Sequence, residues 1–340
     1  MRAVVYSRTG PSSVLELVDR EVAEPGPGEV RVRLVRAGVN PTDWKFRANG
    51  MNGDWSEVVP GQDGAGVVDA IGAGVEGLKE GERVWTVLAQ FQRPGGTAAD
   101  FTVQPADRVV PLPVGASWDL GASLGVPAVT AHRALTAGED VDRISPGSMS
   151  GMTVLVAGGA GAVGNAAIQL ARWAGATVIA TVSSDEKAAL AVAAGARHTV
   201  NYKVGDPAAE IQALCPEGVD LVVEVALAQN VGLDVEVLRN RGTIAYYADT
   251  GGAEASVPVR GTFAKNLRLQ GVLLYTLGAD LVEAATADVN AAVDVGALRV
   301  GEDAGLPLHH YPLEQAAAAH DAVEQGTVGK VLLDVAEDAG

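Results

Sequence analysis

Cysteine is nearly absent from the sequence, and this absence restricts both its covalent and its metal chemistry. Cys215 is the only cysteine among the 340 residues, so the chain can form neither an internal disulfide nor a metal site built from several cysteines. A chain without disulfides suits a reducing compartment. We therefore expect a cytoplasmic protein.

Aromatic residues and positive charges are also scarce. Aromatic side chains make up 4% of the residues, whereas glycine occurs 42 times, which suits small-residue packing and tight turns. The chain has 25 basic and 42 acidic residues, and its formal net charge of −17 opposes binding to the phosphate backbone of nucleic acids. We expect no nucleic-acid partner, although a local cluster of donors can still hold a phosphate-bearing cofactor.

Long hydrophobic runs are missing as well. Ser7, Arg8 and Gly10 interrupt the N-terminal segment too early for a secretory signal. The uncharged stretch 152–171 has the length of a membrane span, but glycines separate its strand-like part from its helix-like part. We expect neither export nor a membrane partner.

Two sequence patterns divide the chain, whose length already favours two domains. Residues 1 to about 127 contain short β-like runs separated by turns with Pro and Gly, which predict a mostly β domain. From residue 153 onward, apolar strand patterns alternate with helical ones, which predicts a doubly wound parallel sheet in an α/β domain. The predicted strands of this sheet are 154–157, 177–182, 199–202, 221–225 and 243–247.

A glycine array lies between the first of these strands and a helix. The strand Val154–Ala157 leads into Gly159, Gly161 and Gly164, which form a G-x-G-x-x-G pattern. Glycines allow a tight turn and the close approach of a pyrophosphate, and the N-terminus of the following helix stabilises negative charge. The pattern is weak alone, but its place between a strand and a helix predicts a dinucleotide site.

The end of the second strand bears on the choice between NAD and NADP. An acid at this place binds the ribose 2′-hydroxyl of NAD, but the sequence has Ser183 there, with Lys187 one helical turn later to pair with a 2′-phosphate. Asp185 and Glu186 argue for NAD, although acids also suit the first turn of a helix. Tyr202 can contact the adenosine end or simply end its strand. We expect NADPH to be preferred.

Further short segments match a known family. They are 38–41 (GVNP), 60–66 (PGQDGAG), 81–84 (GERV), 131–135 (AHRAL), 223–230 (VEVALAQN) and 329–333 (GKVLL). With these segments and the glycine array, the chain resembles the zinc-independent quinone oxidoreductases of the medium-chain dehydrogenase/reductase superfamily, and especially the zeta-crystallin branch. The resemblance covers nearly the whole chain.

This resemblance implies a split architecture. A mostly β, GroES-like catalytic domain would comprise residues 1–127 and 277–340, and a Rossmann NADPH-binding domain would comprise residues 128–276. The strand, helix and strand patterns between residues 308 and 335 would return to the first sheet. Subunits of the family pair edge to edge through the Rossmann sheet, so the resemblance also implies a homodimer or homotetramer.

The resemblance also implies which residues contact NADPH. Those expected at the pyrophosphate are Ala160, Gly161, Ala162 and Val163, and those expected at the adenosine phosphate are Ser183, Lys187 and Tyr202. The remaining cofactor contacts are expected from Lys45, Thr130, Asn230, Tyr247, Ala248, Asp249, Thr250, Val272, Leu273, Leu274 and Lys330.

The zinc-binding relatives carry a Cys and a Gly-His-Glu motif where this sequence has Asn40 and Gln62, and their cysteine cluster is missing here. With these ligands gone, we expect no metal site.

Hydride delivery to a quinone or enone then needs mainly orientation and hydrogen bonds to the developing oxyanion. Asn40 is the first candidate donor, unless it is only a turn residue. Lys45, where the family usually has tyrosine, and Asp43, which also suits a helix start, are further catalytic candidates.

The expected activity is NADPH-dependent reduction of quinones without zinc. A near alternative is reduction of the carbon–carbon double bond of α,β-unsaturated carbonyl compounds, because both reactions need the same hydride geometry. A third alternative is a non-enzymatic NADPH-binding protein with a structural or RNA-binding role. The net charge of −17 argues against RNA.

Overall fold

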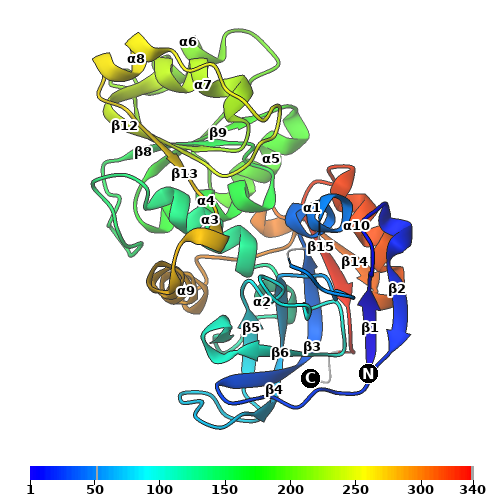
Figure 1. Ribbon diagram of the computed structural model, residues 1–340. Coiled ribbons are helices and arrows are strands. Elements are labelled where there is room, and N and C mark those ends of the chain that lie inside the picture. Colours follow the sequence, from blue (N-terminus) through cyan, green and yellow to red (C-terminus); the bar gives the residue numbers. More distant parts are fainter. Residues whose placement is uncertain (51–52, 338–340) are drawn as a thin grey trace. The chain divides into compact units, whose positions relative to one another are not determined.

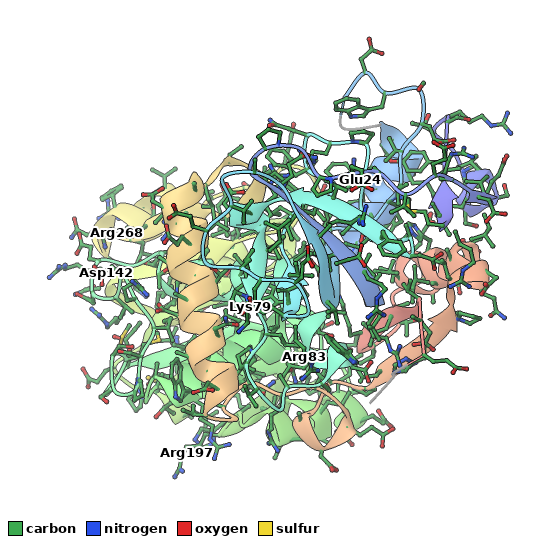
Figure 2. All side chains as sticks on the ribbon, turned by 90° about the horizontal axis from the view of Figure 1, so that it is seen from below. Glu24, Lys79, Arg83, Asp142, Arg197 and Arg268 are labelled. Atoms are coloured by element: carbon green, nitrogen blue, oxygen red, sulfur yellow. The ribbon has the colours of Figure 1, made fainter. Side chains whose placement is uncertain are left out.

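The computed structural model describes residues 1–50 and 53–337, and the chain divides into two compact units (Figure 1). Unit 1 comprises Met1–Val126 and Pro307–Gly340, and unit 2 comprises Pro127–Leu306. Charged side chains such as Glu24, Asp142 and Arg197 are exposed at the surface (Figure 2). Among the described helices, none is long and apolar enough to cross a membrane.

A seven-stranded sheet forms the centre of unit 1. Its strand order is β14-β15-β3-β4-β5-β7, and β6 also pairs with β3. These strands are β3 (Glu29–Val39), β4 (Asp63–Ile71), β5 (Arg83–Thr86), β6 (Phe101–Pro105), β7 (Val109–Pro111), β14 (Leu308–Pro312) and β15 (Lys330–Asp334). A separate pair is formed by β1 (Arg2–Val5) and β2 (Glu16–Asp19). The helices are α1 (Pro41–Asn49), α2 (Trp118–Gly121) and α10 (Ala316–Glu324), with 3-10 turns at Ser12–Val14, Ala106–Arg108 and Leu313–Gln315.

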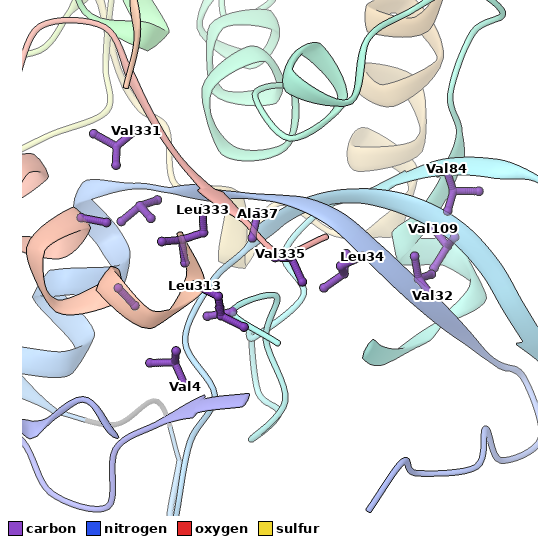
Figure 3. Packing of buried hydrophobic residues seen from close by; sticks show 14 of the residues in the cluster. Val4, Val32, Leu34, Ala37, Val84, Val109, Leu313, Val331, Leu333 and Val335 are labelled. Atoms are coloured by element: carbon purple, nitrogen blue, oxygen red, sulfur yellow. The ribbon is translucent and has the colours of Figure 1, made fainter. Parts of the chain in front are cut away.

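The core of unit 1 combines the long strand β3 with the returning strand β15 (Figure 3). Val32 and Leu34, two residues apart on β3, lie on one face of the strand and are fully buried. Strand β15 pairs antiparallel with β3 and adds Val331 and Leu333 to the same cluster. Each buried side chain of this size contributes about 1.5–3 kcal/mol to stability. The segment after unit 2 thus completes the first sheet.

Unit 2 is built on a six-stranded parallel sheet with the order β10-β9-β8-β11-β12-β13. Its strands are β8 (Thr153–Ala157), β9 (Thr177–Val182), β10 (His198–Asn201), β11 (Val219–Glu224), β12 (Leu238–Tyr246) and β13 (Arg268–Gly271). Its helices are α3 (Gly125–Leu135), which spans the boundary between the units, α4 (Ala162–Trp173), α5 (Asp185–Ala194), α6 (Pro207–Leu214), α7 (Leu227–Val237), α8 (Val259–Ala264) and α9 (Ala279–Asp294), with 3-10 turns at Leu274–Thr276 and Glu302–Ala304. The first strand lies in the middle and later strands extend to either side, which is the Rossmann order. The predicted fold class, a Rossmann domain plus a mostly β domain, is confirmed.

The boundary between the units differs from the expected one. Residues 277–306, expected in the catalytic domain, belong to unit 2. The physical reason is that this segment is attached to α4. Asn165 Nδ2 donates to the carbonyl of Ala304 at 2.8 Å, and Gln169 Nε2 donates to the carbonyl of Arg299 at 3.0 Å.

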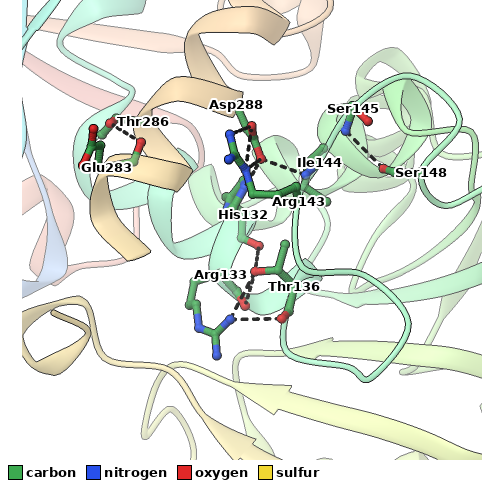
Figure 4. A network of polar contacts seen from close by, with 10 residues as sticks. All are labelled: His132, Arg133, Thr136, Arg143, Ile144, Ser145, Ser148, Glu283, Thr286 and Asp288. Atoms are coloured by element: carbon green, nitrogen blue, oxygen red, sulfur yellow. Dashed lines mark hydrogen bonds and ion pairs between the residues drawn. The ribbon is translucent and has the colours of Figure 1, made fainter. Parts of the chain in front are cut away.

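A buried carboxylate holds three segments of unit 2 together (Figure 4). Asp288 of α9 accepts the backbone N–H of Ile144 at 2.8 Å, and it lies 2.8 Å from Nε2 of His132 and 2.9 Å from Nε of Arg143. Burial alone would raise the pKa of Asp288, but hydrogen bonds from Arg143, His132 and Ile144 outweigh burial and lower it. Asp288 therefore stays ionised and ties the segment at 143–144 to helices α3 and α9.

Replacing Asp288 with alanine should lower the free energy of unfolding by about 2–3 kcal/mol, because buried donors at His132 and Ile144 lose a charged acceptor. Denaturation in urea, followed by far-UV circular dichroism, measures the loss. Arg143→Ala is the matched control, since this side chain is 53% exposed and its removal should cost under about 1 kcal/mol. Equal losses in the two variants would contradict the central role of the carboxylate.

Candidate active site

The glycine turn connects β8 to α4 at the carboxyl edge of the parallel sheet. Strand β8 ends at Ala157, and Gly158 follows with a φ of +68°, in the left-handed region that favours glycine. A Cβ on Gly164 would lie 2.4 Å from the carbonyl oxygen of Gly158, so the helix can pack on the turn only without a side chain there. Helix α4 begins at Ala162, and its N-terminus with the positive end of its dipole therefore lies at this turn.

The four residues predicted to hold a pyrophosphate all belong to this turn and to the start of α4. Gly161 is the N-cap of α4 and is exposed, while Ala162 and Val163 are half-buried and Ala160 is buried. An exposed glycine at a helix N-terminus allows backbone N–H groups to approach phosphate oxygens closely. The turn therefore fits the pyrophosphate of a dinucleotide.

The residues predicted at the adenosine phosphate lie together at the ends of two paired strands. Ser183 follows β9, and Lys187 Nζ donates to Ser183 Oγ at 3.1 Å. Tyr202 follows β10, its backbone N–H donates to the carbonyl of Val182 at 3.1 Å, and its side chain is exposed. A cation and a hydroxyl are thus in contact here, and Tyr202 follows the neighbouring strand; such donors suit a phosphate.

The other residues predicted to contact the dinucleotide in unit 2 follow the next strands of the same sheet. The segment 247–250 follows β12, and the segment 272–274 follows β13. Val272 is linked back to the sheet by its N–H, which donates to the carbonyl of Tyr246 at 2.8 Å. Thr130 lies on α3 and is buried.

Glu224, at the end of β11, is a buried acid that the sequence analysis did not single out. It is fully buried and accepts hydrogen bonds from Asn230 Nδ2, at 3.1 Å, and from the backbone N–H of Ala226. Asp234, one turn beyond Asn230 on α7, is also buried; burial and the charge of Glu224 raise the pKa of Asp234 well above its usual value. Glu224 thus fixes the amide of Asn230. An acid that ends the apolar run 221–223 is the sequence signal that could have identified it.

In unit 1, helix α1 starts directly after β3, and Asn40 and Asp43 define its N-terminus. Pro41 occupies the first helical position, where its missing N–H has no cost. Asp43 Oδ2 accepts the backbone N–H of Asn40 at 2.7 Å, and both side chains are 2% exposed. Burial raises the pKa of Asp43 to about 7 against the hydrogen bond from Asn40, and the charge of Asp63 adds to the rise.

The Asn40 side chain belongs to a buried, charged cluster. Its Nδ2 donates to Asp63 Oδ2 at 2.8 Å, and its Oδ1 accepts a hydrogen bond from Lys330 Nζ at 2.7 Å. Lys330 and Asp63 also form an ion pair at 3.1 Å, with side chains that are 2% and 0% exposed. Asp63 Oδ1 accepts the backbone N–H of Val126 at 2.7 Å. Three segments that carry the family resemblance therefore meet here: 38–41, 60–66 and 329–333.

The contacts of this cluster differ from those predicted for Lys330 and add Asp63 as a new residue of the site. The ammonium group of Lys330, expected at the cofactor, is directed at Asn40 and Asp63. Lys45 is half-buried on α1 and has interactions of its own. Asp63 was not among the candidates, and its signal in the sequence is a lone acid within the glycine-rich segment 61–66.

Gln62, which the resemblance places where zinc-binding members carry a histidine, is buried, and its Nε2 donates to Gln90 Oε1 at 3.1 Å. Within residues 1–50 and 53–337, no three His, Cys, Asp or Glu side chains group closely enough to hold a metal ion. The polar groups of the unit 1 cluster are instead an amide, an ammonium and two carboxyls.

A parallel sheet of this strand order with a glycine turn at the start of a helix is the fold of dinucleotide-binding enzymes. Residues 26–114 match the family described as alcohol dehydrogenase GroES-like domain, and residues 162–291 match the family described as zinc-binding dehydrogenase. The sequence is 30% identical to the quinone oxidoreductase of Rattus norvegicus over 344 residues, covering 98% of this chain and 97% of the relative. The chain belongs to the quinone oxidoreductases of the medium-chain dehydrogenase/reductase superfamily.

Solved structures share the fold over nearly the whole chain. An NAD-dependent alcohol dehydrogenase superimposes with a TM-score of 0.86 at 31% identity, covering 99% of this chain and 100% of that one. A mycobacterial protein complexed with NADPH superimposes with a TM-score of 0.81 at 30% identity, covering 98% of this chain and 99% of that one.

The buried acid Asp43 should make stability depend on pH. Its folded pKa of about 7 lies above the unfolded value of about 3.9, so its contribution is complete below pH 4 and is lost as the pH rises through 7. Between these two pKa values, the loss of the proton-linked contribution of Asp43 lowers the free energy of unfolding by up to about 1.4 kcal/mol for each unit of rising pH. Asp43→Asn should remove this decline, since an amide does not titrate and its oxygen can still accept the N–H of Asn40.

Urea denaturation of both proteins between pH 5 and 8 measures the difference. The control is Asp185→Asn, which changes an exposed acid at the start of another helix and should leave the pH profile unchanged. Parallel profiles for the native protein and Asp43→Asn would show that Asp43 is ionised throughout.

Proposed function

We propose that this protein is an NADPH-dependent quinone oxidoreductase that transfers hydride without zinc. The observation that carries the cofactor assignment is the contact of Lys187 with Ser183, at 3.1 Å, at the strand end where an acid would select NAD. The full-length similarity to a quinone oxidoreductase supports the substrate class. When bound, NADPH supplies the hydride.

The residues of unit 2 would bind and orient the dinucleotide along the carboxyl edge of the sheet. The turn at 160–163 would hold the pyrophosphate through backbone N–H groups at the start of α4. Ser183, Lys187 and Tyr202 would hold the 2′-phosphate. Asn230, whose amide is fixed by Glu224, and the segments 247–250 and 272–274 would contact the rest of the dinucleotide; Thr130, from α3, would lie near the nicotinamide.

The residues of unit 1 would assist the charge that develops on the quinone oxygen. Asn40 Nδ2 has a second N–H beyond the one given to Asp63, and we assign this N–H to the substrate oxygen. Lys45, on the first turns of α1, is a second candidate to contact cofactor or substrate. Asp43 holds the backbone at Asn40 and so fixes the position of that donor.

The side chains at the place of the zinc ligands support hydride transfer without zinc. Asn40 and Gln62 replace a thiolate and an imidazole, and an amide is a poor ligand for zinc in comparison with either. The ammonium of Lys330 also lies within hydrogen-bonding distance of Asn40, where it repels a second cation.

The proposal extends to assembly and compartment. Strand β13 is at one edge of the parallel sheet, and its Gln270 and Gly271 are exposed. An open edge can pair with the same strand of a second copy, which supports a homodimer or, with a further interface, a homotetramer. The single cysteine supports a cytoplasmic protein.

The unmodified protein should oxidise NADPH when a small quinone is added, and this activity should survive incubation with a strong chelator. Loss of NADPH absorbance is followed with a panel of quinones and α,β-unsaturated ketones, with a primary alcohol plus NADP⁺ as the reverse control. Turnover of the unsaturated ketones alone would assign double-bond reduction. Alcohol oxidation that the chelator abolishes would contradict the proposal.

Lys187→Ala should weaken NADPH binding by about 5- to 30-fold, or about 1–2 kcal/mol, and leave NADH binding unchanged, because only NADPH carries the 2′-phosphate. Nicotinamide fluorescence titration measures both dissociation constants. Arg197→Ala is the matched control. It removes the same charge from an exposed site just before β10, at the amino end of that strand and so away from the strand ends where Ser183 and Tyr202 lie. Equal affinities of the native protein for the two cofactors would refute the preference.

A further inference from the structure

The partners of Asn40 leave only one orientation for its side-chain amide. The oxygen and nitrogen of an amide have the same shape, and hydrogen-bond partners decide which is which. The Lys330 ammonium can only donate and the Asp63 carboxylate can only accept. Oδ1 therefore faces Lys330, at 2.7 Å, and Nδ2 faces Asp63, at 2.8 Å. The opposite orientation would place donor against donor and acceptor against acceptor.

The ion pair that imposes this orientation is itself fixed in place. Asp63 is held from two sides, because its carboxylate accepts the N–H of Val126 and its carbonyl accepts the hydroxyl of Thr97, each at 2.7 Å. A Cβ on Gly38 would lie 2.8 Å from Lys330 Nζ, and a Cβ on Gly125 would lie 2.2 Å from Asp63 Oδ1. Backbone without side chains therefore encloses the pair, and neither charge can reach water.

Asp43 holds the backbone of Asn40 and also lies beside its side-chain amide, a contact that lowers the pKa of Asp43 against the larger rise caused by burial. It accepts the backbone N–H of Asn40 at 2.7 Å, whereas Asp63 accepts the side-chain N–H. Asp43 thus holds the backbone N–H of Asn40, and Asp63 holds one of the two N–H groups of its side chain.

We propose that Asp63 and Lys330 are positioning residues for the reduction, which hold the Asn40 amide so that its second N–H is presented to the oxygen of the substrate. This inference rests on the donor role proposed for Asn40. A donor that is already oriented does not have to turn as negative charge develops, and this preorganisation is what lowers the barrier. The charge of Lys330 on Oδ1 also polarises the amide and strengthens its N–H as a donor.

The test is the double variant Asp63→Asn/Lys330→Met. Changing both residues removes the two charges together. A change of only one of them would leave the other as an unpaired buried charge. An asparagine at position 63 can present either an oxygen or an N–H, so the direction of the Asn40 amide is no longer imposed. We expect kcat for quinone to fall at least about tenfold, while the dissociation constant of NADPH changes less than about twofold.

A matched control neutralises another ion pair of the same sheet. Arg31 Nε and Asp69 Oδ2 lie 2.6 Å apart on β3 and β4, and neither has a hydrogen bond to Asn40. Arg31→Met/Asp69→Asn should leave kcat as in the native protein. An equal fall of kcat in this control would attribute the loss to general damage and would overturn the proposal.

A cycle with Asn40→Ala tests whether the pair acts through Asn40. Asn40→Ala alone should lower kcat by about 10- to 100-fold, and adding the double variant to it should lower kcat by less than about twofold more. A full additional loss would overturn the proposal, since the pair would then act elsewhere. Native turnover in Asn40→Ala would also overturn it.

Hydrogen exchange of the Asn40 side-chain amide, identified by NMR through its loss in Asn40→Ala, tests the positioning without any turnover. In the native protein the Asn40 amide should exchange at least about a hundredfold more slowly than the amide of the exposed Asn49. In the double variant the Asn40 amide should exchange at least about tenfold faster than it does in the native protein. Exchange as fast as that of Asn49 would overturn the proposal even if the double variant failed to fold. A protected amide in a protein that oxidises no NADPH would refute the proposed function and leave the positioning intact.

Discussion

The buried ion pair between Lys330 and Asp63 constrains its surroundings in unit 1, which must supply hydrogen-bond partners and space for it. Two charges without access to water are tolerated only when hydrogen bonds compensate them, and Asn40, Val126 and the pair itself supply such bonds. The space for the pair requires glycine at two backbone positions, 38 and 125. The pair also links β15 to β4 across β3, so the last strand of the sheet cannot shift its register without separating the charges.

The parallel sheet of unit 2 is the part of the fold that the sequence predicts best, for a physical reason. Strands buried on both faces are continuous apolar runs, and such runs are visible locally. The strand expected at 177–182 has these bounds in β9, and that expected at 154–157 differs from β8 by one residue. The grouping of Ser183, Lys187 and Tyr202 follows from the same logic, because each comes directly after a strand, or one helical turn later, at a common edge.

What the sequence does not predict depends on contacts between distant segments. Nothing near residues 277–306 indicates that they attach to α4 through Asn165 and Gln169, so the boundary at 306 could not be placed. The partners of Asn40 are equally hidden, since Asp63 and Lys330 come from separate strands. The motifs around these residues indicated a shared family. They gave no sign that a predicted cofactor contact, Lys330, would point into a buried cluster.

The division of the chain also determines an order of assembly during synthesis. Unit 2 is one continuous segment, whereas unit 1 needs residues 307–337 as well as the first 126. A ribosome that adds about 5–20 residues per second would take about 10–40 s to make the intervening segment. During that time β3 has a bare edge and Asp63 has no cation beside it. Until residues 307–337 are made, the nascent chain therefore carries an open sheet edge that can pair with other chains.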